Sequence, residues 1–259
     1  MKKKANLIFT IFLCVTCLLG CYKLLDNNNS SNNNNIAETN KPTIENSEFD
    51  FSNTTLAFLG DSITYGYVTK QGGQYANPWP KLVGETLDAK ESINYGIGGT
   101  NIAKVEGKTN SFVERYTTMD NNIDIIGVMG GTNDWGNNVP LGTIDDIDET
   151  TIYGALNLIA SGLKEKYPNS YIFFMSPIPR KETWVNSQGY KMKDVRDAFL
   201  NVANKYDLGF LDMYYLSGFE NEMKLDTTDG VHPSQELVTN SFAPTISQFI
   251  KENYKKQNN

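Results

Sequence analysis

Five short apolar runs, separated by longer amphipathic stretches, constrain the fold of this chain more than any other feature. Most of their consecutive positions are apolar, which is typical of strands buried on both faces of a parallel sheet. The pattern predicts strands at 55–60, 92–96, 123–130, 171–177 and 208–213.

The amphipathic stretches predict four helices, at 78–89, 150–168, 189–206 and 233–256. Pro168 should end the second helix, Pro233 suits the first turn of the fourth, and Pro244 should kink or break that helix. The alternation indicates an α/β fold: a three-layer α/β/α sandwich with a central, mostly five-stranded parallel sheet and right-handed crossovers. Sites in such folds form beyond the carboxyl ends of the strands.

Residues 1–20 have the pattern of a secretory signal peptide, with three lysines before an apolar run from Leu7 to Leu19. A run of about 13 residues is short beside the roughly 20 of a spanning helix, which remains the alternative as an uncleaved anchor. The following LLGC, residues 18–21, resembles the bacterial lipobox, in which cleavage precedes a cysteine that carries a diacylglycerol. We therefore expect Cys21 to be lipidated and to anchor the chain to the outer face of the bacterial cell membrane.

Residues 21–50 are a predicted flexible tether, because Asn27–Asn35 holds seven asparagines and nothing apolar. Cleavage would remove Cys14 and Cys17, so no cysteine would remain for a disulfide, metal site or thiol nucleophile. It would also change the formal net charge from −7 to −10, which makes a nucleic-acid partner unexpected. Residues 51–259 form one predicted domain.

Polar motifs fall where the predicted fold places a site. Ser62 follows the first strand, and three further polar loops lie at 94–100, 130–136 and 229–234. Because parallel strands end at one edge of a sheet, we expect these loops to converge. A serine after Gly-Asp is by itself more typical of a turn or a helix cap, so its surroundings must decide its role.

His232 is the only histidine in the chain, so no other imidazole could activate Ser62. Asp229 stands three residues earlier, close enough to accept the Nδ1 proton and fix the tautomer. No Gly-x-Ser-x-Gly motif surrounds Ser62, which argues against the α/β-hydrolase fold.

Four separated blocks in order make the chain similar to the SGNH (GDSL-type) hydrolase family over about residues 54–252. The blocks are Gly60–Ile63, Asn94–Gly99, Gly131–Asp134 and Asp229–His232. The first ends in isoleucine where the family has leucine, which is a common apolar exchange. The resemblance implies the flavodoxin-like form of the three-layer fold and a serine esterase, and we expect no cofactor or metal ion.

The same resemblance assigns a catalytic triad. Ser62 would be the nucleophile, His232 its general base and Asp229 the carboxylate that orients the imidazole. Asp61 and Asp134, which neighbour the motif residues, are expected to fix loops rather than to take part in the chemistry.

An oxyanion hole is also implied, formed by the backbone N–H groups of Ser62 and Gly99 and the side-chain amide of Asn133. Glycine lets the backbone come close without a Cβ in the way. Gly98 is the alternative donor to Gly99. Asn133 could instead cap or turn the chain, and so could Asn94.

Aromatic residues in the same loops could stack on sugar rings, although each could equally serve packing: Tyr65, Tyr67, Trp135 and Trp184. With surface tethering, they suggest short-acyl or O-acetyl esters on carbohydrate at the cell surface as substrate, whether a small molecule or a polysaccharide. The alternative is a lysophospholipase or short-chain lipid esterase. A further alternative is an inactive surface-binding lipoprotein. The sequence indicates no oligomeric state.

Overall fold

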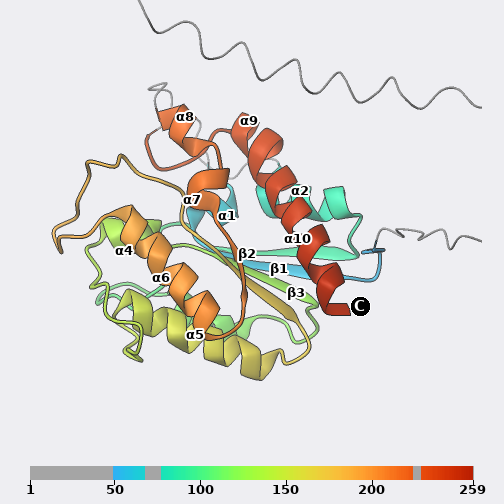
Figure 1. Ribbon diagram of the computed structural model, residues 1–259, viewed down its shortest axis with the longest axis horizontal. Helices are drawn as coiled ribbons and strands as arrows, with labels where there is room; N and C mark the ends of the chain where they lie inside the picture. The colour runs from blue at the N-terminus through green and yellow to red at the C-terminus, as the bar shows by residue number, and fades with distance from the viewer. Residues whose placement is uncertain (1–48, 68–76, 224–228, 259) are drawn as a thin grey trace, which may run out of the picture. The chain divides into compact units, whose positions relative to one another are not determined.

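A five-stranded parallel sheet lies at the centre of the computed structural model, which describes residues 49–67, 77–223 and 229–258 (Figure 1). The predictions for the signal peptide, Cys21 and nearly all of the tether lie outside these residues. The strands are β1 (Thr55–Gly60), β2 (Glu91–Gly96), β3 (Ile125–Met129), β4 (Tyr171–Met175) and β5 (Gly209–Leu211). The predicted fold class is confirmed.

The strand order β2-β1-β3-β4-β5 creates a switch point beside β1. After β1 the chain adds β2 on one side and then crosses to add β3 on the other, so the connections leave β1 in opposite directions. A crevice for ligands forms at such a point, beyond the carboxyl ends of the strands. Gly60 ends β1 there, paired in register with Gly96 of β2 and Met129 of β3.

Helices cover both faces of the sheet (Figure 1). Leu56 and Phe58 of β1 pack with α2 and α10, whereas Ala57 and Leu59 pack with α5 and α6. The helices are α1 (Ser62–Tyr65), α2 (Trp79–Leu87), α3 (Phe112–Arg115), η1 (Tyr116–Thr118), α4 (Thr132–Gly136), α5 (Ile152–Lys166), α6 (Met192–Lys205), α7 (Met213–Leu216), α8 (Phe219–Met223), α9 (Gln235–Leu237), η2 (Val238–Phe242) and α10 (Ala243–Asn258).

The fourth predicted helix is divided into α9, the π-helical turn η2 and α10. Pro244 is the second residue of α10, directly after that turn, as expected of a residue that cannot donate a backbone hydrogen bond. The prediction for Pro233 was wrong. Pro233 precedes the N-cap Ser234, whose side chain accepts a hydrogen bond from the Leu237 N–H.

The packed part of the chain reaches back to Phe49, two residues before the predicted start of the domain. The Phe49 ring lies 4.8 Å from that of Phe51 and 5.0 Å from that of Tyr254 on α10. Within the described ranges, no helix combines the length and the apolar character that crossing a membrane requires.

Candidate active site

Ser62 is the first residue of α1, immediately beyond the end of β1. Asp61 caps this helix by accepting a 2.9 Å hydrogen bond from the Ile63 N–H. The N–H of Ser62 itself lies in the first turn, where backbone donors have no partner within the helix. The serine is only 7% exposed, less than its place at a strand end suggests.

Ser62, His232 and Asp229 form a continuous hydrogen-bonded chain. His232 Nε2 lies 2.8 Å from Ser62 Oγ, and His232 Nδ1 lies 2.9 Å from Asp229 Oδ2. Burial would raise the pKa of Asp229, but hydrogen bonds from His232 and Val231 lower it overall below its usual value. An ionised Asp229 accepts the Nδ1 proton, which leaves Nε2 free to accept the proton of Ser62.

The loop that carries Asp229 and His232 is a tight turn. Asp229 Oδ1 accepts hydrogen bonds from the backbone N–H groups of Val231 and His232, both at 2.9 Å. Gly230, between Asp229 and Val231, has a φ of +73°, in the left-handed region that favours glycine. This turn aims the His232 ring at Ser62.

Asn133 lies in the first turn of α4, at the carboxyl end of β3. Its Nδ2 donates a 2.8 Å hydrogen bond to the Thr100 carbonyl oxygen, which uses one of its two amide hydrogens. A Cβ on Gly98 would lie 4.0 Å from Ser62 Cβ, so this loop runs beside Ser62. Gly99 follows with a φ of +74°. The structure therefore brings the Gly98–Gly99 loop and Asn133 to one edge of the sheet.

Two carboxylates lie buried beneath these loops. Asp134 accepts hydrogen bonds from the N–H groups of Ile102 and Ala103, and thereby ties α4 to the loop that follows Gly99. Burial raises the pKa of Asp134 to about 6 and that of Asp61 to about 7. Both hold backbone, as expected of residues that fix loops.

Arg115 is a buried residue that the sequence analysis missed. Its guanidinium donates hydrogen bonds to the carbonyl oxygens of Gly60, at 2.6 Å, and Tyr95, at 2.5 Å. Burial lowers the pKa of Arg115 to about 10. Through these two hydrogen bonds, Arg115 joins the ends of β1 and β2, where the loops that carry Ser62 and Gly99 begin.

Asn94 also has a structural contact. Its Nδ2 donates to the Thr64 carbonyl oxygen of α1, at 2.9 Å, while its Oδ1 accepts from the Gly96 N–H, at 2.8 Å. Asn94 thus joins α1 to β2, which fits the capping or turn role left open for it.

Comparison with known protein families adds sequence evidence to this geometry. The chain matches the GDSL-like Lipase/Acylhydrolase family over residues 58–237, a range that includes Ser62, Asn133 and His232. This chain belongs to that family.

Solved structures share the fold of this GDSL-like protein. One crystal structure is 28% identical and covers 79% of this chain and 99% of its own, with a TM-score of 0.72. A Lactobacillus plantarum protein is 27% identical and covers 77% of this chain and 97% of its own, with a TM-score of 0.66. A carbohydrate acetylesterase family member from Sinorhizobium meliloti is 22% identical and covers 76% of this chain and 99% of its own. Its TM-score of 0.54 shows a shared fold. Comparison with curated proteins finds no match.

Two of the predicted substrate-binding aromatics lie together in this GDSL-like hydrolase fold. The rings of Trp135 and Trp184 stack with centroids 6.4 Å apart and an angle of 13° between their planes. Trp135 Nε1 donates to the Tyr190 carbonyl oxygen, at 3.2 Å, and Trp184 is 43% exposed. Trp135 lies two residues after Asn133 in α4, and the exposed Trp184 presents an aromatic surface to solvent.

The two tyrosines that closely follow Ser62 in the sequence lie in different surroundings. Tyr65 ends α1 and is 36% exposed. The Tyr67 ring instead packs on the ring of His232, with centroids 4.9 Å apart. Tyr67 therefore contacts the triad directly.

A cavity of about 590 Å³ opens between the segment after β4 and helices α7 and α8. It is lined by Pro179, Arg180, Lys181, Glu182, Thr183, Tyr214, Tyr215 and Glu220. Arg180 connects it to the triad, because its guanidinium donates a hydrogen bond to the Gly230 carbonyl oxygen.

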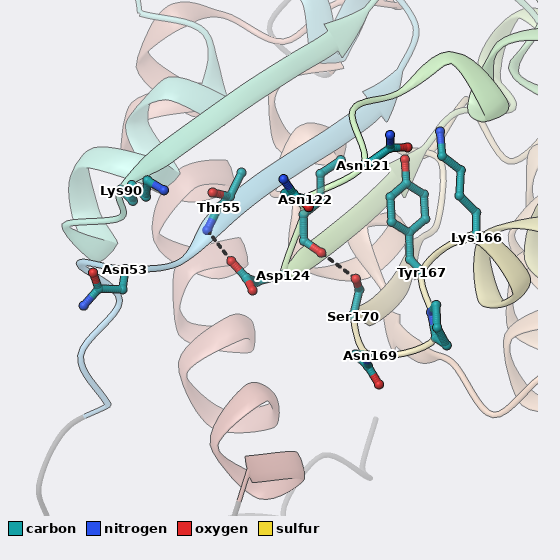
Figure 2. Close-up of a pocket in the computed structure, with 12 residues that line it drawn as sticks. Asn53, Thr55, Lys90, Asn121, Asn122, Asp124, Lys166, Tyr167, Asn169 and Ser170 are labelled. Atoms are coloured by element: carbon teal, nitrogen blue, oxygen red, sulfur yellow. Dashed lines mark hydrogen bonds between the residues drawn. The ribbon is translucent and has the colours of Figure 1, made fainter.

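A second hollow, of about 320 Å³, lies at the opposite edge of the sheet (Figure 2). Asp124, just before β3, accepts a 2.8 Å hydrogen bond there from the N–H of Thr55, the first residue of β1. This hollow is at the amino ends of the strands, away from the triad. Among the described residues, no cluster of His, Cys, Asp or Glu side chains could hold a metal ion.

Proposed function

We propose that this GDSL-like protein is a serine esterase that hydrolyses carboxylic esters through an acyl-enzyme. The observation that carries the proposal is the hydrogen-bonded chain from Ser62 Oγ through His232 to Asp229. It supplies a nucleophile, a base and a carboxylate that orients the base, which is what acyl transfer to a serine requires.

In the first half-reaction, His232 Nε2 takes the proton of Ser62 as Oγ attacks the ester carbonyl carbon. The tetrahedral intermediate collapses when His232 returns that proton to the departing alcohol. In the second half-reaction, His232 activates a water molecule, which releases the acid and restores Ser62. Asp229 stabilises the imidazolium in both halves.

The oxyanion would receive hydrogen bonds from the N–H groups of Ser62 and Gly99 and from Asn133 Nδ2. The bond to the Thr100 carbonyl oxygen holds the Asn133 amide in place and leaves its second hydrogen for the oxyanion. Donors fixed before the reaction cost no reorganisation when the negative charge develops.

Short-acyl or O-acetyl esters on carbohydrate are the substrates that we propose. Trp184, stacked on Trp135, supports this choice, because its exposed indole ring provides a flat apolar surface for a sugar ring. The Sinorhizobium meliloti protein described as a carbohydrate acetylesterase family member shares the fold. The cavity lined in part by Arg180, which binds the Gly230 carbonyl oxygen, offers room for a bulky alcohol.

A lysophospholipase or short-chain lipid esterase is the second candidate. The family includes lipases by name, and an enzyme tethered at a membrane would meet lipid substrates there. An inactive surface-binding lipoprotein is a further alternative, against which the assembled triad argues.

We also propose that the mature protein is lipid-anchored at Cys21 on the outer face of the bacterial cell membrane, because LLGC follows a lysine-rich signal. Cys21→Ser should release the protein from the membrane fraction or block its processing. Normal maturation with unchanged fractionation would contradict the anchor.

A substrate panel tests the activity. It contains p-nitrophenyl acetate, butyrate and decanoate, acetylated xylan and lysophosphatidylcholine, each with Ser62→Ala as the matched control. We expect hydrolysis of the acetate and of the xylan acetyl groups. A preference for decanoate and lysophosphatidylcholine would favour the lipid esterase, and no hydrolysis of any ester would contradict the proposed function.

A further inference from the structure

Arg180 is a buried cation next to the loop that carries Asp229 and His232. The reaction described above gives Arg180 no role. It follows β4 and is only 4% exposed. Its Nη1 donates a hydrogen bond to the carbonyl oxygen of Gly230, the residue after Asp229. Burying a guanidinium is costly unless it is paired and hydrogen-bonded, so such a residue needs a structural reason.

The loop that Arg180 binds carries two members of the triad. The bonds from Val231 and His232 to Asp229 Oδ1 are local, so they shape the turn without attaching it to the sheet. The bond from Arg180 joins the same turn to the segment after β4, 50 positions away in the chain. It thereby fixes the loop backbone against the edge of the sheet that presents Ser62.

The charge of Arg180 also lies among the charges of the site. Burial lowers the pKa of Arg180 to about 10, while the nearby Asp61 and Asp229 oppose that change. At neutral pH the guanidinium is therefore still protonated. The protonated Arg180 therefore lies near Asp61, which caps the Ser62 helix, and near Asp229, which orients His232.

We propose that Arg180 is a positioning residue of the active site. Through its hydrogen bond to Gly230, it holds the Asp229–His232 loop at the position where His232 contacts Ser62. The kinetic part of this inference rests on the proposed esterase activity. The structural part, that Arg180 sets the Asp229–His232 geometry, does not.

The test compares two variants. Arg180→Gln loses the positive charge, whereas Arg180→Lys keeps the charge but lacks the planar guanidinium group. For p-nitrophenyl acetate we expect Arg180→Gln to lower kcat about 100-fold with a smaller change in KM, because small displacements of reacting groups cost about that much. Arg180→Lys should lose less. A wild-type kcat in folded Arg180→Gln would contradict the proposal.

Arg196→Gln is the matched control. Arg196 is a partly buried arginine whose hydrogen-bond partners are Asp212 and Asp197 rather than the backbone of the Asp229–His232 loop. This variant should lower the melting temperature while its kcat stays close to that of the wild type. A loss of kcat as large as that of Arg180→Gln would show a general stability effect and contradict the specific role.

A second measurement is independent of activity. The chain has one histidine, so an untagged sample shows one imidazole Nδ1 proton in the NMR spectrum. In the wild type its hydrogen bond to Asp229 should place it far downfield, and Arg180→Gln should move or broaden this signal while Arg196→Gln does not. An unchanged signal in Arg180→Gln would overturn the inference. A wild type that shows the signal but hydrolyses no ester would instead overturn the proposed function alone.

Discussion

His232 Nε2 lies 2.8 Å from Ser62 Oγ, although 170 positions separate the two residues in the chain. Ser62 follows β1 directly, whereas His232 comes from the loop after β5 and α8. Their contact therefore depends on the whole sheet and on the loop attachments at its carboxyl edge. Small displacements of these loops should therefore reduce catalysis before the fold itself is lost.

Ser62→Ala should abolish ester hydrolysis and leave the fold intact. The substitution removes one oxygen, whose hydrogen bond is to His232, and alanine is compatible with the first turn of α1. Hydrolysis of p-nitrophenyl acetate and thermal melting followed by circular dichroism measure the two effects. Full activity in the folded variant would remove Ser62 from the mechanism.

Asn133→Ala should lower kcat by about 10²- to 10³-fold with a smaller change in KM, as expected for a donor used mainly in the transition state. Asn137→Ala is the control, because Asn137 Nδ2 also donates to a neighbouring loop, at Asn101 Oδ1, from the end of the same helix. Its kcat should stay close to the wild-type value. Equal effects of the two substitutions would mean that Asn133 only supports the loop.

Substitutions at two adjacent glycines distinguish the backbone donor. Gly99→Ala forces alanine into a φ of +74° and should displace the Gly99 N–H, which lowers kcat. Gly98→Ala places a methyl group 4.0 Å from Ser62 Cβ, an ordinary van der Waals contact, so KM should change more than kcat. The reverse pattern in steady-state kinetics would assign the donor to Gly98.

The buried Asp61 should make the folded state less stable as the pH rises from about 4 to about 7. Burial raises its pKa from 3.8 to about 7, so in this window the folded protein binds a proton that the unfolded chain has released. Asp61→Asn cannot ionise and can still cap α1. Its free energy of unfolding, measured with urea across the window, should fall less than that of the wild type. Parallel curves for the two proteins would contradict a buried, protonated Asp61.

The strands and the triad could be predicted from the sequence for different physical reasons. β1, β3 and β4 are buried on both faces, which needs apolar residues at consecutive positions, and this pattern is visible in a single chain. Ser62, Asp229 and His232 could be predicted because they sit in recognisable motifs and because the histidine is unique. The short helices α1 and α4 were missed, since four or five residues are too few to show a helical period.

The buried arginines could not be predicted, because nothing next to them in the sequence marks them. Arg115 and Arg180 bind carbonyl oxygens of Gly60 and Gly230, 55 and 50 positions away, and those partners are set by the tertiary fold alone. An arginine in a sequence is usually an exposed residue. The contact of Tyr67 with the His232 ring likewise depends on which loops meet at the sheet edge.

The central claim is that His232 activates Ser62 as a nucleophile, and covalent labelling tests it most directly. The protein is treated with a fluorophosphonate, which reacts with an activated serine, and the modified peptide is identified by mass spectrometry. We expect one adduct per chain, located on Ser62, and its loss in both Ser62→Ala and His232→Gln. An adduct on another residue, or equally fast labelling of Ser62 in folded His232→Gln, would contradict the account.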